Sequence, residues 1–146
     1  MILSRSLLSM FLVFAFTKTG FSQIVIKTEN APIPVGPYSQ AIKSGNTLYV
    51  SGQIGVNPAT NKLDSSDFKT EARQVLKNHK AILEAANMSL NQVVKTTVYL
   101  TNLKDFGILN EVFSEFFPTT LPARETIQAA ALPKNAHIEI SIIAVQ

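Results

Sequence analysis

The sequence predicts an α+β fold with a mixed sheet. Two segments carry apolar residues at helical spacing, and six others show the alternating or β-branched pattern of strands. Their order along the chain is β-β-β-α-β-α-β-β, which combines hairpins with helical crossovers. The length of 146 residues, 46% of them hydrophobic and 16% charged, is that of one globular domain.

The sequence before the first expected helix predicts three strands. Alternating polarity marks residues 24–28 as a short strand. Three prolines and a glycine exclude a helix in residues 30–37 and indicate an irregular loop. Gly45-Asn46 is a hairpin signal between the strand-like residues 39–44 and 47–51.

Two helices are expected in the rest of the chain. Residues 67–87 form the clearest apolar stripe, and Asp67 offers an N-cap. Residues 103–117 place four phenylalanines and Leu109 on an inward stripe that ends before Pro118. The stretch from Gly52 to Lys62 is expected to be a loop.

The strands around the second helix predict two distinct sheet faces. They are residues 93–101, 124–130 and 137–145. Because side chains alternate along a strand, one face of the last strand is apolar and the other polar. We expect the polar face to carry Glu139 together with Arg124, and the apolar face to carry Ile127 under the helices. Such a polar face is either solvated or meets another subunit.

The first 22 residues have the organisation of a secretory signal peptide. Arg5 supplies a positive start, and residues 7–16 form an apolar core too short to span a membrane. Gly20 and Ser22 suit cleavage before Gln23. We therefore expect a mature domain of residues 23–146 that is exported to the periplasm or secreted, without stable membrane association. An uncleaved anchor or an amphipathic start of the domain are the alternatives.

Charge and composition argue against several classes of function. Without Arg5 and Lys18 the basic residues fall from 13 to 11 against 10 acidic ones, so the net charge falls from +3 to +1. No basic run is present, and we expect no nucleic-acid partner. The absence of cysteine excludes disulfides and thiolate chemistry. His79 and His137 lack ligand spacing, so no metal site is expected.

Several segments, taken in order, resemble the RidA (YjgF) family of reactive-intermediate deaminases. The segments cover the expected mature domain from end to end, with the spacing of the family. They are GPYSQA (36–41), SGQIGVNP (51–58), VVKTTVYL (93–100), NEVFSEFF (110–117), PAR (122–124) and LPKNAHIEISIIAV (132–145).

This resemblance implies a fold, an assembly and a reaction. The fold would be similar to that of the small chorismate mutases, with a six-stranded sheet and two helices on one face. Three subunits would pack sheet against sheet into a barrel-like homotrimer with sites between subunits. The reaction would be hydrolysis of 2-iminobutanoate or 2-iminopropanoate to a 2-keto acid and ammonia, without a cofactor.

The resemblance also implies three catalytic residues. Arg124 would bind the substrate carboxylate, for which a planar guanidinium is suited. Glu139 would position or activate the attacking water as a general acid–base group. Tyr38 would contribute its hydroxyl to substrate or water and its ring to the pocket wall.

Four further residues would bind substrate: Asn110, Ser51, Gly52 and Thr126. We expect the Asn110 amide to share a helix face with Phe106 and Phe113. The chain departs from many family members at Glu125-Thr126, where they have Ser-Cys, and at Ser141, where they have a second Glu. These departures leave carboxylate binding intact and bear on the identity of the substrate.

Other functions remain open at this level. An exported protein with this cleft is alternatively a non-enzymatic binder of small carboxylates, or a hydrolase of a related C–N bond. RNA cleavage is a third possibility, which would require a basic groove that the near-neutral mature chain does not indicate.

Overall fold

The computed structural model describes residues 22–64 and 66–146. The expected signal peptide lies outside the described residues, apart from Ser22. The strands are β1 (Gln23–Ile26), β2 (Ala41–Ser44), β3 (Thr47–Ile54), β4 (Val56–Asn57), β5 (Lys62–Leu63), β6 (Val93–Leu100), β7 (Ala123–Gln128) and β8 (Ile138–Val145). The α-helices are α1 (Phe68–Ala85) and α2 (Phe106–Phe116), and the 3-10 helices are η1 (Leu90–Gln92), η2 (Leu103–Asp105) and η3 (Pro133–Asn135).

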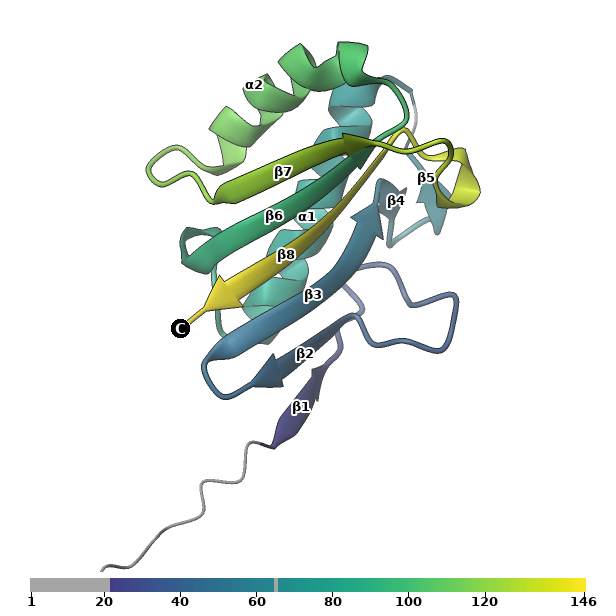
Figure 1. Cartoon of the computed structure of the whole chain (residues 1–146). Coiled ribbons are helices and arrows are strands. Elements are labelled where there is room, and N and C mark those ends of the chain that lie inside the picture. Colours follow the sequence, from purple (N-terminus) through teal and green to yellow (C-terminus); the bar gives the residue numbers. More distant parts are fainter. Residues whose placement is uncertain (1–21, 65) are drawn as a thin grey trace, which may run out of the picture.

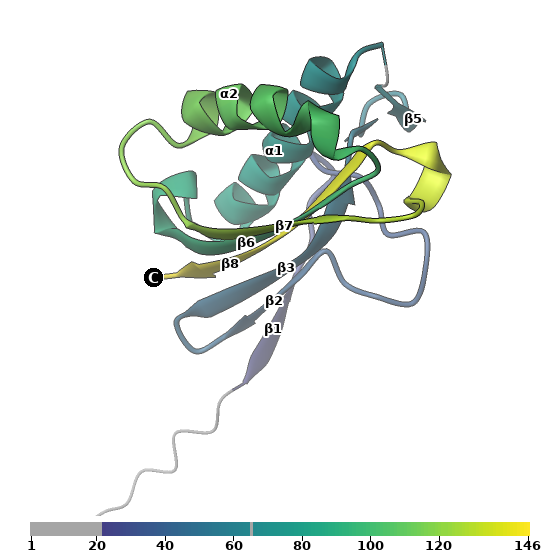
Figure 2. The same ribbon diagram turned by 45° about the horizontal axis from the view of Figure 1, so that its top comes forward.

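The predicted α+β fold with a mixed sheet is confirmed. Six strands form one sheet in the order β1-β2-β3-β8-β6-β7. All neighbours are antiparallel except β6 and β7, which are parallel because α2 carries the chain back between them. Both helices cover the same face of this sheet, and the other face, the open face, is left uncovered (Figures 1 and 2).

The first helix forms where its apolar stripe predicted it. The Asp67 side chain caps the N-terminus by accepting a hydrogen bond of 2.9 Å from the Thr70 amide. Asn87 follows the helix in a left-handed conformation with φ 56°, which an asparagine tolerates at a helix end. The stripe packs on the sheet and makes the core with α2. Its buried apolar members are Ala72, Val75, Leu76, Ile82 and Leu83.

Two boundaries differ from the prediction. The expected helix from residue 103 is divided, because η2 forms a separate turn before α2 begins at Phe106. The expected loop from Gly52 to Lys62 is wrong in part. It contains the end of β3 and a two-stranded ribbon of β4 and β5, whose turn is closed by a 2.8 Å bond from the Asn61 amide to the Asn57 carbonyl.

The assignment of Arg124 and Ile127 to sheet faces was wrong. Arg124 is in register with Thr96, whose side chain is fully buried under the helices, so Arg124 lies on the helix side. Ile127 is in register with Tyr99 on the open face and is half exposed. The physical reason is that β7 is an edge strand beneath α2. The Arg124 guanidinium packs there on aromatic rings of the helix, so the helix side of this strand can hold a charged side chain. Glu139 does lie on the open face, as predicted.

The open face is therefore more apolar than expected. Ile42, Tyr49 and Ile143 are in register across β2, β3 and β8, and Tyr99 adjoins Ile127. Tyr49 and Ile127 are each about half exposed. A sheet face of this kind is ordinarily covered in a soluble protein. No helix among the described residues is long and apolar enough to span a membrane.

A buried carboxylate fixes the start of β8. Glu71 on α1 is fully buried and accepts hydrogen bonds from the backbone amide and Nδ1 of His137, at 2.8 and 2.7 Å. A carboxylate taken from water is stable only with such donors. The opposite side of Glu71 lies against Gly55, where a Cβ would come within 2.5 Å of the Glu71 side chain. Glu71 thereby links α1 to the start of β8 and packs against the connection between β3 and β4.

His79 on α1 is a second buried polar group. Its Nε2 lies 2.8 Å from the Ile140 carbonyl oxygen and donates to it, and its Nδ1 has no partner among the described residues. Burial lowers the pKa of His79 from 6.5 to about 4. The imidazole is therefore neutral in the folded protein at neutral pH.

This pKa predicts acid destabilisation. The unfolded chain takes up a proton at His79 near pH 6.5, whereas the folded chain takes it up only near pH 4. The contribution of the neutral His79 to the free energy of unfolding is therefore fully present above pH 6.5 and is lost as the pH falls from 6.5 to 4. The shift corresponds to about 3 kcal/mol. Urea unfolding should show that the free energy of unfolding of the wild type falls across this pH range. In His79→Gln the fall should be about 3 kcal/mol smaller. Carboxylates titrate equally in both proteins, so parallel pH profiles would contradict the prediction.

Candidate functional site

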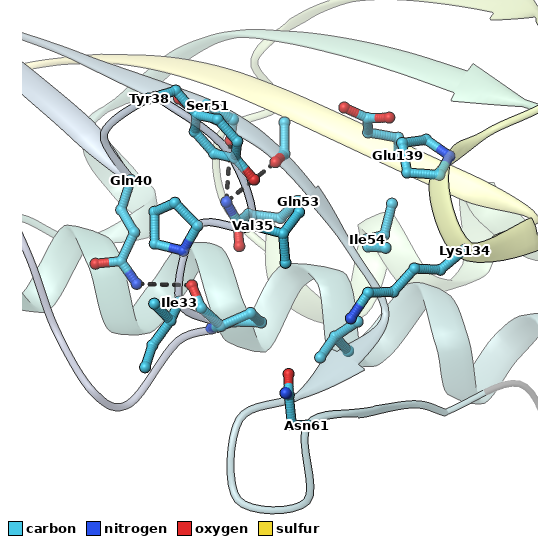
Figure 3. A pocket seen from close by; sticks show the side chains of 15 residues that line it. Ile33, Val35, Tyr38, Gln40, Ser51, Gln53, Ile54, Asn61, Lys134 and Glu139 are labelled. Carbon is cyan, nitrogen blue, oxygen red and sulfur yellow. Dashed lines mark hydrogen bonds between the residues drawn. The ribbon is translucent and has the colours of Figure 1, made fainter.

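Four of the expected site residues line one cavity at the end of the sheet. Tyr38, Ser51, Gly52 and Glu139 surround a volume of about 430 Å³, here called the Glu139 pocket (Figure 3). Tyr38 comes from the proline-rich segment before β2, Ser51 and Gly52 from β3, and Glu139 from β8. Tyr38 is half exposed, so it is a wall of the cavity and not a core residue.

Glu139 is the carboxylic acid of this pocket. Its carboxylate accepts no hydrogen bond and pairs with no cation in residues 22–64 and 66–146. Partial burial raises the pKa of Glu139 above its ordinary value, because removal from water disfavours the charged form. A carboxylate with a raised pKa and free lone pairs is a stronger base toward a bound water than a fully solvated carboxylate.

The shape of β3 depends on Glu139. The register between β3 and β8 shifts between Val50 and Gln53, so Ser51 and Gly52 form a bulge. A Cβ at Gly52 would lie 2.9 Å from the carboxyl carbon of Glu139, which is an overlap. Only glycine leaves room for the carboxylate at this position.

Two glutamines, which the sequence did not single out, hold the pocket walls. Gln40 is buried and fixes the segment before β2 by donating to the carbonyls of Ala31 and Pro32, at 3.2 and 2.9 Å. Gln53 donates to the Gly52 carbonyl at 3.1 Å. Ser51 donates its hydroxyl to the Ser39 carbonyl at 2.7 Å, which leaves its oxygen free to accept. Gln40 lies in the GPYSQA segment, and this position was the sequence signal that could have identified it as a site residue.

The remaining expected residues form a second group, the Arg124 cluster. The Arg124 guanidinium lies over the Phe106 and Phe113 rings, 5.2 and 4.7 Å from their centroids. Its Nη2 donates to Asn110 Oδ1 at 2.7 Å. Asn110 thus shares a helix face with the two rings as predicted, although it is exposed. Thr126 lies on the same side of β7, with a buried hydroxyl that has no partner among the described residues.

The guanidinium is held in place but not neutralised. The described carboxylates within salt-bridge distance of arginine or lysine all pair with Lys69, Arg73, Lys80 or Lys95, and none with Arg124. Packing on the rings lowers the pKa of Arg124 through desolvation, yet arginine stays charged at neutral pH. The Arg124 cluster therefore holds a fixed positive charge that no described carboxylate neutralises, and such a guanidinium is suited to binding an anion.

The two groups lie on opposite sides of the sheet. Glu139 faces away from the helices, because Ile138 and Ile140 on either side of it are fully buried beneath them. Arg124 lies on the helix side of the edge strand β7. One small molecule cannot touch both groups in a single chain.

Comparison with known proteins places the chain among its relatives. A family model described as Endoribonuclease L-PSP matches residues 28–146. A RutC family protein of Pyrococcus horikoshii is 54% identical over 120 residues, which are 82% of this chain and 95% of the relative. The chain belongs to the RidA (YjgF) family. The resemblance seen in the motifs is thereby confirmed.

Two further RidA-family comparisons bear on activity and fold. The 2-iminobutanoate/2-iminopropanoate deaminase of Mus musculus is 48% identical over 122 residues, 84% of this chain and 90% of that protein. The crystal structure of RidA from an Antarctic Psychrobacter species has a TM-score of 0.82 at 51% identity, covering 84% of this chain and 99% of that one. The expected class of enzyme, a hydrolase of the imine deaminase type, is confirmed by such relatives.

Among the described residues, no group of three or more His, Cys, Asp or Glu side chains is placed to hold a metal ion. Glu139 and Lys134 are the charged side chains that line the pocket, and Arg124 is the charged side chain of the cluster.

Gly52→Ala tests the fit between β3 and Glu139. The added methyl group should push the carboxylate toward solvent at little cost in stability, because the side chain is flexible. We expect hydrolysis of 2-iminobutanoate to fall at least about tenfold. Gly107→Ala is the matched control, since a Cβ there meets nothing within 4 Å and should stabilise α2 slightly. Full activity in Gly52→Ala would contradict the role given to this contact.

Proposed function

We propose that the protein hydrolyses 2-imino acids of the 2-iminobutanoate and 2-iminopropanoate type at sites built between two subunits. The observation that carries this proposal is the placement of Arg124 and Glu139 on opposite sides of the sheet. The two half-sites differ in what they offer. The Glu139 pocket has an acid–base group, and its lining cation, Lys134, forms no ion pair with Glu139. The Arg124 cluster has a guanidinium held on aromatic rings but no acid or base.

Arg124 binds the substrate carboxylate in this scheme. Its Nη2 is engaged by Asn110, and the guanidinium rests on Phe106 and Phe113. The remaining N–H groups are free to donate to two carboxylate oxygens. In the proposed assembly, a carboxylate held in this orientation would present the adjacent C=N carbon to the Glu139 pocket of the neighbouring subunit.

Glu139 activates the water. In its ionised form it takes a proton as the water oxygen bonds to the imine carbon, which gives a tetrahedral carbinolamine. It returns that proton to the nitrogen, then takes the proton of the new hydroxyl group and passes it to the same nitrogen, so that the C=O bond forms as the C–N bond breaks and ammonia leaves a 2-keto acid. The Tyr38 hydroxyl and the Ser51 oxygen line the same cavity and can orient the water. An imine is already electrophilic, so the chemistry requires no cofactor.

The open face supports an assembly of subunits. Its apolar side chains, among them Tyr49 and Ile127, are about half exposed in the single chain. If each subunit offers its Arg124 cluster to the Glu139 pocket of the next, the contacts close into a ring with identical sites. On the resemblance to RidA proteins, the ring we propose has three subunits with the sheets facing inward.

Mixed assemblies test the shared site. Arg124→Ala should lower kcat/KM at least about hundredfold by removing charge-assisted bonds. Glu139→Gln should lower kcat by a similar or larger factor. Trimers that contain both variants, purified by two different tags, should recover about one third of wild-type activity, because one site in each ring has both native residues.

The outcomes separate several functions. No recovery in mixed trimers would place both residues in one subunit's site and contradict the shared site. If the wild type does not accelerate imine hydrolysis but 2-oxobutanoate still raises its melting temperature, the protein is a non-enzymatic carboxylate binder. Arg73→Ala is the matched control, because this arginine pairs with Glu115 on the helix surface at 2.7 Å and should leave turnover unchanged.

We also propose that residues 1–22 direct export and are removed. The Arg5 start, the apolar residues 7–16 and the small residues Gly20 and Ser22 support this. The first described strand begins at Gln23, so cleavage before that residue would leave every described strand and helix in place.

Expression of the full chain in bacteria tests this proposal. The intact mass of the exported protein should match residues 23–146, whereas Leu12→Arg should stay in the cytoplasm because the apolar core is interrupted. A chain that begins at Gln23 after an added methionine is the matched control for folding. Full-length protein in the cytoplasm of wild-type cells would refute export.

A further inference from the structure

The Glu139 pocket has a second polar end that the proposed reaction does not use. Lys134 of η3 and Asn61 of the β4–β5 turn both line the cavity. Figure 3 shows the Lys134 side chain extending from η3 across the pocket toward Asn61. The RidA-type half-sites described above need neither residue.

Both residues have a backbone conformation that is uncommon outside glycine. Asn61 has φ 54°, and Lys134 has φ 56° and ψ 23°. Asparagine tolerates this left-handed region, but a lysine there has no local compensation and costs free energy. Such residues cluster at ligand sites, where the surroundings hold them. In η3 the conformation turns the lysine toward the pocket.

The ammonium group of Lys134 is not used elsewhere. No carboxylate in residues 22–64 and 66–146 lies within 4.0 Å of it. Glu139 is not its ion-pair partner either, because the two side chains do not come within 4.0 Å of each other. The cation and the acid therefore occupy separate places in the same cavity.

The wall between these two ends is apolar. Ile33, Val35, Ile54 and Val56 line it. The cavity of about 430 Å³ lies in the size range of pockets that hold drug-sized ligands. It has room for a longer side chain than that of 2-iminobutanoate, with methylene groups against the wall and a charged end beyond it.

We propose that Lys134 and Asn61 bind a carboxylate at the end of the substrate side chain, which makes dicarboxylic 2-imino acids such as 2-iminoglutarate and 2-iminosuccinate the preferred substrates. This rests on the proposed function. Arg124 of one subunit holds the carboxylate beside the imine carbon, Glu139 of the next acts on that carbon, and Lys134 beside Glu139 holds the distal carboxylate. The bonds made and broken are those of the same hydrolysis.

The test compares dicarboxylic and apolar imines of similar length. Freshly generated 2-iminoglutarate, 2-iminosuccinate and 2-iminohexanoate are supplied to the wild type and to Lys134→Met, and keto-acid release is measured. We expect kcat/KM for at least one dicarboxylic imine to exceed that for 2-iminohexanoate about tenfold or more in the wild type. Lys134→Met should lower the dicarboxylic value about 10- to 100-fold, mainly through KM, and leave 2-iminohexanoate unchanged.

Two variants separate binding from folding. Lys134→Gly should show the same loss with an equal or higher melting temperature, because glycine adopts the left-handed backbone without strain. Lys77→Met is the matched control, since this lysine is exposed on α1 outside the cavity. An equal effect of Lys134→Met on both kinds of imine would overturn the subsite.

The two proposals fail in distinguishable ways. A wild type that accelerates 2-iminohexanoate but neither dicarboxylic imine refutes the subsite and keeps the deaminase. A wild type that accelerates no imine refutes the deaminase, and the subsite is then judged from binding. In that case 2-oxoglutarate should raise the melting temperature more than 2-oxohexanoate does, and Lys134→Met should abolish the difference. Equal shifts would refute the subsite as well.

Discussion

Side-chain alternation along β8 is the constraint on which the site depends. Ile138, Ile140 and Ile142 are buried beneath the helices, so Glu139 must point to the open face. A shift by one residue would bury the carboxylate and expose the isoleucines, which the loss of apolar burial forbids. Glu71 reinforces the same register, because its buried carboxylate binds the backbone just before the strand. The acid is thus positioned by the packing of its neighbours.

At the edge of the sheet, in β7, polar side chains lie on the helix side of the strand and an apolar side chain lies on the open face. In β7 the helix side carries Arg124 and Thr126, because α2 offers them aromatic rings and an amide in place of a closed apolar core. Stacking on Phe113 holds the guanidinium in one orientation without neutralising it. The edge strand therefore presents a charged receptor outward, while β8, two strands away in the sheet, presents an acid on the other face. This division explains why a second subunit is needed to complete the proposed site.

The Glu139 pocket is organised before any ligand binds. Gln40 fixes the proline-rich wall through hydrogen bonds to consecutive carbonyls, and the bulge at Ser51 and Gly52 opens β3 beside the acid. Rigid walls reduce the entropy that a small substrate must lose on binding. The same cavity places a lysine with a strained backbone at a distance from the acid, which suits a ligand charged at both ends.

The sequence by itself determined the order of the six main-sheet strands and the two α-helices, the Asp67 cap, the alternation in β8 and the motifs that identified the family. These depend on contacts within a few residues, which have fixed periods along the chain. Only the tertiary structure decided that Arg124 lies under α2, that Gly52 makes room for Glu139 and that Lys134 enters the pocket. The side of an edge strand that meets a helix is set by register with distant elements, and Ile127 looked like a core residue for that reason. Left-handed backbone at a lysine likewise has no local sequence signal, because the surrounding fold imposes it.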